Sequence, residues 1–319
     1  MTATAFDKTE RVTMNPAQHG LDVMLCEVLG ATISGGTASS PIGIDAISDI
    51  GGGSISRTLL VESARRRFFV KLNDARLAGM FAAEADGLSA LARCPAVRVP
   101  RVVGYGTSGR QAYLVLEYLP LQALRAPGQG ATAGQALAAL HRIQGSEFGW
   151  PRDNFIGSTA QSNIPHRTWP FFFARRRLLP QLELAKRASQ HSQLISSGER
   201  LAEKLAALFV DHQPAPSLLH GDLWYGNAAV DESGQLALFD PAVYFGDREA
   251  DLAMTELFGG FPDSFYAAYR AAWPLADGFE QRKTLYNLYH VLNHLNLFGN
   301  AYLNQAERMI NRLLAEIGR

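Results

Sequence analysis

The sequence predicts an α+β fold of two lobes, in which an antiparallel sheet with one helix comes first and a mainly helical part follows. Short runs rich in Val, Ile, Leu and Phe, separated by glycine and polar turns, indicate strands at 44–50, 56–62, 67–72, 101–105 and 112–117. A helical run lies among them at 75–93. Beyond Gly130 the apolar spacing is helical, at 131–143, 170–188, 194–210, 248–258 and 283–297.

An island of short apolar pieces interrupts the helical part between Ser217 and Asp240. Glycine and polar residues separate these pieces, which therefore fit short strands joined by turns. We expect a flexible arm at 1–18, a first lobe at 19–119 and a second lobe at 120–319. A chain of 319 residues is long enough to bury a core without a disulfide or a metal.

The composition argues against several classes of protein. Hydrophobic residues make up 47% of the chain and charged residues 19%, with a formal net charge of zero, which fits neither a nucleic-acid binder nor a disordered chain. Cys26 and Cys94 lie far apart and outside any CxxC pair, so neither a disulfide framework nor a thiolate metal site is indicated. We find no signal-peptide core at the N-terminus and no run of the roughly 18 apolar residues that span a membrane. We expect a cytoplasmic monomer that binds neither nucleic acid nor membrane.

The strongest motif is HGDLWYGN at 220–227, which is followed by FDP at 239–241. Kinase catalytic loops place an aspartate, which accepts the proton of the substrate hydroxyl, five positions before an asparagine that binds Mg²⁺. Asp222 and Asn227 have this separation, and Asp240 stands where a second metal-binding acid is expected. Asp, Gly and Asn are also common turn residues. Their joint occurrence in this order favours catalysis, with Asp222 as the base and with Asn227 and Asp240 as Mg²⁺ ligands.

A kinase also needs a cation for the phosphates of ATP, and a strand lysine oriented by a helix glutamate supplies it in known kinases. Lys71 lies at the end of the strand-like run FFVK, and Glu84 lies in the predicted helix, where it could pair with Lys71. Alone, either side chain is more often a solvated surface residue. Because the catalytic motif is also present, we interpret the two as the nucleotide-binding pair of a protein-kinase-like fold.

Two further segments are candidates for ATP binding. The glycine-rich segment between the first two predicted strands could bring backbone N–H groups close to phosphates because no Cβ intrudes, although it also fits a flexible hairpin turn. Its candidate residues are Gly52, Gly53 and Ser54. The last strand of the first lobe ends where kinases hold adenine, which is an inference from topology alone. The candidates there are Glu117, Tyr118 and Leu119.

Acidic residues gather at a predicted helix start after the FDP motif, and Asp251 is the one with two interpretations. Acids stabilise a helix N-terminus on dipole grounds alone. In a kinase-like fold Asp251 would also accept backbone N–H bonds from the catalytic loop and, with His220, hold its shape. Both interpretations stay open at this point.

Taken together, these residues resemble the fructosamine kinase (ketosamine-3-kinase) family, which shares the aminoglycoside-phosphotransferase-like branch of the kinase fold. The resemblance rests on HGDLWYGN and on the run FDPAVYFGDREADLAM. Shorter segments that look like family positions lie at 69–73, 148–150, 153–157 and 289–299. The resemblance therefore extends from about Leu21 to the C-terminus.

The resemblance implies a kinase that uses ATP and Mg²⁺ to phosphorylate the sugar 3-hydroxyl of a ketosamine, either a small molecule or one linked to a protein. The phosphorylated adduct then falls apart and frees the amine, which is deglycation. Trp224 would offer its indole face to the sugar, although a tryptophan more often packs in a core. His290 and His294 would line the substrate cleft, with core packing about as well supported. Their spacing could also bind zinc, but no third ligand is evident.

Two other functions remain as alternatives. A kinase of another small hydroxylated amine, such as an aminoglycoside or choline, would share the fold. A non-catalytic, nucleotide-binding pseudokinase normally lacks the base, a metal ligand or the lysine, whereas this chain has them all. Fructosamines, ribulosamines and erythrulosamines all stay open as substrates, because one carbon changes only a few contacts.

Overall fold

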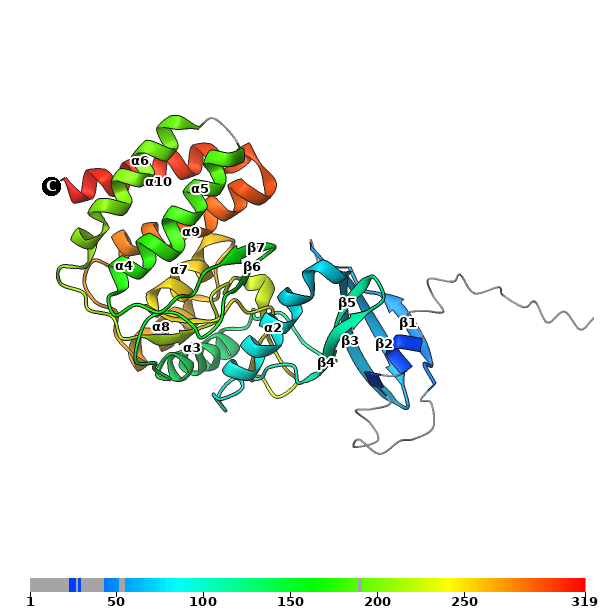
Figure 1. The fold of residues 1–319 in the computed structure, drawn as a ribbon. Coiled ribbons are helices and arrows are strands. Elements are labelled where there is room, and N and C mark those ends of the chain that lie inside the picture. Colours follow the sequence, from blue (N-terminus) through cyan, green and yellow to red (C-terminus); the bar gives the residue numbers. More distant parts are fainter. Residues whose placement is uncertain (1–22, 27, 30–42, 52–54, 189–190, 319) are drawn as a thin grey trace, which may run out of the picture.

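The structure is a computed structural model that describes residues 23–26, 28–29, 43–51, 55–188 and 191–318. It has the two lobes that the sequence predicts, a sheet with a helix beside it and a larger helical body (Figure 1). The α+β class is confirmed. The predicted arm at 1–18 and the candidates Gly52, Gly53 and Ser54 lie outside the described residues, and the division between residues 119 and 120 stays a prediction.

The first lobe is a five-stranded antiparallel sheet in the order β1-β2-β3-β5-β4. Its strands are β1 (Ala46–Asp49), β2 (Arg57–Ser63), β3 (Arg66–Asp74), β4 (Val102–Ser108) and β5 (Gln111–Glu117). In β3, Phe68 and Val70 pack into a core cluster with Leu25, which lies in a helical segment near the N-terminus. Successive side chains of a strand point to opposite faces, so Lys71 points the other way, toward the second lobe.

Helix α2 (Ala78–Leu91) lies between the sheet and the helical body (Figure 1) and follows a 3₁₀ turn, Ala75–Leu77. Its Phe81 belongs to the same core cluster as Leu238 of the second lobe. A Cβ at Gly87 would lie 3.0 Å from the side chain of Pro241, so α2 packs directly on the segment after Asp240. The core therefore continues from one lobe into the other, which fixes the position of α2 relative to the FDP motif.

The second lobe consists mainly of helices, several of them close to their predicted positions. They are α3 (Pro127–His141), α4 (Trp169–Phe173), α5 (Leu179–Ala188), α6 (Ser192–Lys204), α7 (Glu249–Leu257), α8 (Asp263–Ala272), α9 (Phe279–Phe298) and α10 (Leu303–Ile317). A π-helical turn, Ala174–Leu178, joins α4 to α5 within the single helix predicted there. The apolar spacing did not predict α8 or α10. It also missed a hairpin of β6 (Asn154–Ile156) and β7 (Thr159–Gln161).

The predicted island at 217–240 forms two small antiparallel sheets with the residues just after it. Strand β8 (Ser217–Leu219) pairs with β11 (Tyr244–Gly246), and β9 (Ala228–Val230) pairs with β10 (Leu236–Leu238). Their apolar side chains are almost all buried, which anchors the short strands despite their length. The HGDLWYGN loop connects β8 to β9 and the FDP motif connects β10 to β11, so pairing of the strands brings the two motifs together.

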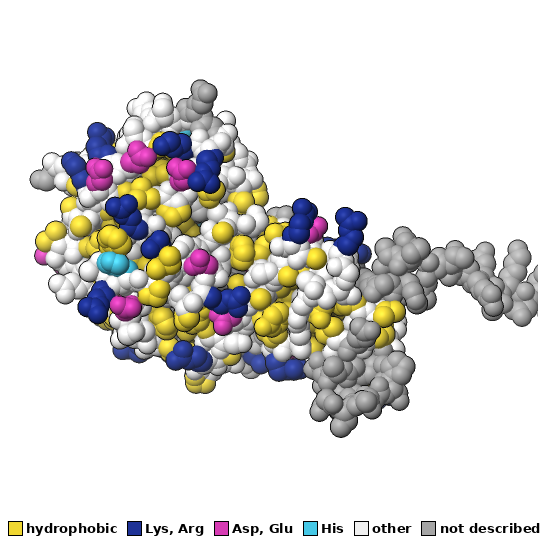
Figure 2. Space-filling model, in the orientation of Figure 1, with side chains coloured by type: hydrophobic (Ala, Val, Ile, Leu, Met, Phe, Trp, Pro, Cys, Tyr) yellow, Lys and Arg dark blue, Asp and Glu magenta, His cyan; other side chains and the backbone are white. Residues whose placement is uncertain are grey.

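The surface of the second lobe mixes both signs of charge. On the face drawn in Figure 2, Lys and Arg side chains lie interspersed with Asp and Glu rather than in one single-sign patch. Within the described residues, every helix is too short or too polar to cross a bilayer.

The contact between α3 and α8 depends on a glycine. A Cβ at Gly134 would lie 2.2 Å from the carbonyl oxygen of Phe265 and 3.0 Å from the backbone nitrogen of Tyr269. A real Cβ never comes so close to backbone atoms, so the two helices can pack in this way only because Gly134 has no side chain.

We expect Gly134→Ala to lower the free energy of unfolding by about 2–3 kcal/mol, because α3 and α8 must move apart. Gly128→Ala, in the same helix with open space around the new methyl group, is the matched control and should stabilise by about 0.5 kcal/mol. Urea unfolding of both variants measures the difference. Equal stability of the two would contradict the packing described for α3 and α8.

Candidate active site

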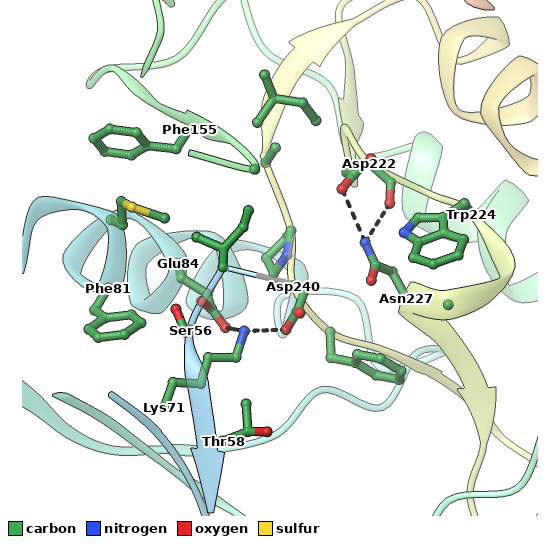
Figure 3. Close-up of a pocket in the computed structure, with 18 of the residues that line it drawn as sticks. Ser56, Thr58, Lys71, Phe81, Glu84, Phe155, Asp222, Trp224, Asn227 and Asp240 are labelled. Carbon is green, nitrogen blue, oxygen red and sulfur yellow. Dashed lines mark hydrogen bonds and ion pairs between the residues drawn. The ribbon is translucent and has the colours of Figure 1, made fainter. Parts of the chain in front are cut away.

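A cleft of about 880 Å³ lies between the lobes and is lined by residues from both (Figure 3). The structure brings most of the predicted site residues to this cleft: Lys71, Glu84, Glu117, Tyr118, Leu119, Asp222, Trp224, Asn227, Asp240, His290 and His294. His220 begins the catalytic loop and Asp251 contacts that loop, and both side chains are buried. The chemical roles of these residues remain predictions, which their geometry makes more specific.

Lys71 lies between two carboxylates in the middle of the cleft (Figure 3). Its Nζ is 2.7 Å from Glu84 Oε1 of α2 and 2.5 Å from Asp240 Oδ1 of the second lobe. Burial alone would lower the pKa of Lys71, but the two carboxylates outweigh this effect and raise the pKa above its usual value. Lys71 is therefore a fixed positive charge, positioned to bind an anion such as a nucleotide phosphate.

Asp222 and Asn227 are joined by a hydrogen bond within the HGDLWYGN loop. The amide nitrogen of Asn227 donates to the backbone oxygen of Asp222 at 2.9 Å and to its carboxylate at 3.2 Å. This fixes which end of the amide faces Asp222, and the amide oxygen points away from it (Figure 3). The Asn227 amide oxygen and the Asp240 carboxylate are hard oxygen donors of the kind that Mg²⁺ prefers, so the residues present fit that ion.

The environment of Asp222 suits a proton acceptor. Burial is the main cause that raises the pKa of Asp222 to about 7, and the negative charge of Asp240 raises it further, while the hydrogen bond from Asn227 opposes both. A base works best when its pKa lies near the working pH, because it is then both deprotonated and strong enough to take a proton. Asp222 meets this condition at neutral pH.

Asp251 holds the backbone of the catalytic loop. Its carboxylate accepts the backbone N–H of His220 at 2.7 Å and of Gly221 at 2.9 Å, and it also contacts His141 Nε2 at 3.2 Å. Gly221 has a φ of +83°, and a Cβ there would lie 2.0 Å from the carbonyl oxygen of Ala242. The Gly of HGD is therefore required by the turn, and Asp251 supports that turn as well as the start of α7.

Asp240 has a left-handed backbone, with φ of +57°. This conformation is uncommon for a residue with a side chain, although Asp tolerates it better than most, and such residues cluster at functional sites. His220 Nε2 contacts the carbonyl oxygen of Phe239 at 3.0 Å, so the catalytic loop and the FDP motif are also joined through His220.

The predicted adenine-binding segment lies along one wall of the cleft. Backbone pairing continues just past β5, where the N–H of Tyr118 donates to the carbonyl oxygen of Arg67 at 3.1 Å. The Glu117 carboxylate is held by Arg98 at 2.9 Å and by the backbone N–H of Arg101 at 2.7 Å. Apolar side chains surround this end of the cleft, among them Phe69, Met80, Leu116 and Phe239. The wall is thus suited to a flat apolar ring system.

Trp224 and the two histidines line the cleft near Asp222. The indole of Trp224 lies half-buried in the cleft, and a Cβ at Gly226 would lie 2.4 Å from it, so the glycine makes room for the ring. His290 Nδ1 is 3.9 Å from Asp222 Oδ1, and burial lowers the pKa of His290 to about 3, which leaves it neutral. His294 Nδ1 contacts the backbone oxygen of His290 at 2.8 Å.

The zinc alternative for the two histidines gains no support. Within the described residues, the one group with metal-ligand spacing is His212, Asp247 and Glu249, away from the cleft. There Glu249 is already paired with Arg282 at 2.7 Å, and Asp247 accepts the hydroxyl of Tyr286 at 2.5 Å. This buried network is satisfied without an ion.

The β6–β7 hairpin also contributes to the cleft, which the sequence did not predict: Asn154, Phe155, Ile156 and Gly157 line it. Asn154 donates to the carbonyl oxygen of Val243 at 2.7 Å and accepts a hydrogen bond from Gln161 at 2.8 Å. These buried bonds fix the hairpin to the segment after Asp240. Asn154 stands between Asp153 and Phe155 without a distinctive spacing to other polar residues, so the sequence held no chemical signal for its role.

Solved structures place this fold in the kinase-like class of phosphotransferases. Aminoglycoside phosphotransferase APH(4)-Ia, in a ternary complex with ADP and hygromycin B, has a TM-score of 0.62 and 16% identity, covering 93% of this chain and 98% of that one. At this identity the likeness concerns the fold alone. A provisionally named fructosamine-3-kinase from Haemophilus somnus is more similar, with a TM-score of 0.81 and 30% identity over 91% of this chain and 96% of that one.

Sequence relatives narrow the class to one family. The family model described as "Fructosamine kinase" matches residues 31–316. A protein named probable ketoamine kinase from Synechocystis is 44% identical, over 87% of this chain and 93% of that protein, and one from Vibrio parahaemolyticus is 43% identical, over 83% and 91%. The chain belongs to the fructosamine kinase family, as its sequence motifs indicated.

The raised pKa of Asp222 predicts a stability that depends on pH. An aspartate has a pKa of about 3.9 when unfolded, so between about pH 4 and 7 the folded protein must keep a proton that the unfolded chain gives up. The folded protein therefore loses unfolding free energy as the pH rises, and the loss is complete above pH 7. Asp222→Asn removes this loss. Relative to the unmodified protein, the variant should therefore gain about 2 kcal/mol more unfolding free energy at pH 8 than at pH 5.

Urea unfolding at the two pH values tests this prediction. Asp211→Asn, which changes an exposed carboxylate outside the cleft, is the matched control and should show no such gain. A pH-independent effect of Asp222→Asn would mean that Asp222 is ionised as readily as an ordinary surface aspartate.

Proposed function

We propose that this chain phosphorylates the 3-hydroxyl of a ketosamine sugar with ATP and Mg²⁺, in a reaction that leads to deglycation. The observation that carries the proposal is the single cleft in which Asp222, Asn227, Asp240 and Lys71 face one another. Membership of the fructosamine kinase family supports the class of substrate. The position of the phosphate on the sugar and the later release of the amine rest on the resemblance of the motifs.

Asp222 is the base in this proposal. Its carboxylate takes the proton from the sugar hydroxyl as the hydroxyl oxygen bonds to the γ-phosphorus and the bond from the γ-phosphorus to ADP breaks. Lys71, held by Glu84, binds the phosphates near the bond that breaks. Mg²⁺, when bound, neutralises charge on the phosphates, and Asn227 and Asp240 are the residues that would hold it. Asp251 keeps the loop that carries Asp222 in shape.

The remaining predicted residues have binding roles. The segment Glu117–Leu119 would bind the adenine, and the glycine-rich segment at 52–54 would bind the phosphates. Trp224 and His290 would bind the sugar on either side of the reacting hydroxyl, His290 as a neutral hydrogen-bonding group beside Asp222. We further propose that the protein acts in the cytoplasm as a monomer.

A panel of ketosamines tests this function. Fructosamine, ribulosamine and erythrulosamine adducts of one amine are offered with ATP and Mg²⁺, and ADP release and the position of the new phosphate are measured. We expect phosphorylation at the 3-hydroxyl of at least one sugar. Choline and an aminoglycoside serve as acceptors for the rival function. Turnover of these acceptors without turnover of any ketosamine would contradict the proposal.

Asp222→Asn is the variant that tests the base. It should lower kcat by about 10³-fold and leave ATP affinity nearly unchanged, because the substituted group acts on the acceptor and not on the nucleotide. The Asp211→Asn variant again serves as the control and should keep full activity. A rate close to that of the unmodified protein would remove Asp222 from this role, and the absence of turnover in the unmodified protein would favour the pseudokinase alternative.

A further inference from the structure

A continuous strip of aromatic rings leads from the catalytic loop to the surface. Its members all line the cleft, and we call them the aromatic strip: Trp224, Tyr225, Phe258, His294, Phe298 and Tyr302. The ring centroids of Trp224 and Phe258 are 6.4 Å apart, and those of Phe258 and His294 are 4.8 Å apart. From His294 the strip continues to Phe298 at 5.3 Å and to Tyr302 at 5.2 Å. The strip combines side chains from the catalytic loop, the end of α7, α9 and the turn after α9.

The strip runs outward from the catalytic base. His290, His294 and Phe298 follow one another at intervals of four on α9, so they lie on one face of the helix. His290 is buried beside Asp222, His294 is half-buried, and Phe298 is 54% exposed. Eight residues of helix cover about 12 Å. The distance suits an extended chain that reaches from the reacting sugar to solvent.

The strip is uncharged. Among the described residues that line the cleft, the charged ones are Lys71, Glu84, Glu117, Asp222 and Asp240, and all of these belong to the nucleotide end or to the catalytic group. Burial lowers the pKa of His294, which keeps it neutral. An anionic group placed on the strip would lose hydration without meeting a cation, whereas an apolar chain would gain by burial.

We propose that the aromatic strip is a second acceptor subsite, which binds the substituent on the amine of the ketosamine and selects apolar substituents over anionic ones. This inference rests on the proposed function. The phosphates occupy the Lys71 side of Asp222, so the rest of the acceptor extends toward α9. Only two carbons separate the hydroxylated carbon from the amine nitrogen, so the substituent on that nitrogen begins next to His290 and continues along the strip.

The test uses one sugar, the one turned over fastest in the ketosamine panel, attached to methylamine, n-hexylamine or glycine. KM and kcat are measured for each adduct by ADP release. The subsite predicts a KM about tenfold lower for the hexylamine adduct than for the methylamine adduct, because several methylenes become partly buried. It predicts a higher KM for the glycine adduct than for the methylamine adduct, since the carboxylate must be desolvated.

Phe298→Ala removes one ring of the strip and leaves the catalytic group unchanged. It should remove most of the advantage of the hexylamine adduct while leaving KM for the methylamine adduct, kcat and KM for ATP within about twofold. Phe171→Ala, which removes another exposed ring outside the cleft, is the matched control and should change none of these values.

The outcomes distinguish the two proposals. If no adduct is phosphorylated, the proposed function fails and this inference fails with it. If all three adducts are phosphorylated with the same KM, the function stands and the subsite is wrong. The same holds if Phe298→Ala raises KM equally for the methylamine and hexylamine adducts. The comparison of adducts on the unmodified protein needs no variant, so the inference stays testable even if Phe298→Ala folds poorly.

Discussion

The ion cluster of Lys71 with Glu84 and Asp240 is the interaction on which the cleft depends. It joins the central strand of the sheet, helix α2 and the FDP motif of the second lobe at one ammonium group. A buried lysine without carboxylates would lose its charge, and two such carboxylates without the lysine would repel each other. The cluster therefore fixes the distance between the lobes at the proposed nucleotide site. A bound phosphate could replace Asp240 as a partner of Lys71 and so leave Asp240 available to a metal ion.

The positions of the other reacting groups are set by the backbone. The left-handed turns at Gly221 and Asp240, together with the bonds from two loop N–H groups to Asp251, determine where Asp222 and Asn227 point. These hydrogen bonds are buried, and a buried polar group without a partner costs free energy. The bonds therefore fix the geometry of the loop. This arrangement explains why a residue buried behind the cleft, such as Asp251, lies within the motifs that identify the family.

The parts of the site that are local in the chain could be predicted from the sequence. Asp222, Asn227 and Asp240 lie within twenty residues of one another, and short paired strands carry them, so their spacing alone predicted a shared site. Lys71 and Glu84 could be predicted as a pair because the strand and helix that carry them adjoin in the chain. The fold class followed from the change of apolar period after the first lobe.

The outer part of the proposed acceptor side, beyond Trp224, His290 and His294, could not be predicted in the same way. Phe258 lies 40 or more residues before Phe298 and Tyr302 in the chain, and the packing of α7 against α9 brings Phe258 to His294, which both of the later rings also contact. An aromatic residue at a helix end has no spacing that distinguishes a binding role from core packing. The stripe of Ala306, Ile310 and Leu313 in α10 has a helical period that could have predicted this helix, whereas the amide network of the β6–β7 hairpin has no such pattern.

The most direct test of this account is the affinity for ATP, measured by calorimetry with and without Mg²⁺. Lys71→Met should weaken binding by about tenfold or more in both conditions, since a charge-assisted contact to the phosphates is lost. Asp240→Asn should instead remove most of the gain that Mg²⁺ gives. Lys283→Met is the matched control, because Lys283 also pairs with two carboxylates but lies outside the cleft. An ATP affinity that Lys71→Met leaves unchanged, or a gain from Mg²⁺ that survives Asp240→Asn in full, would contradict the central claim.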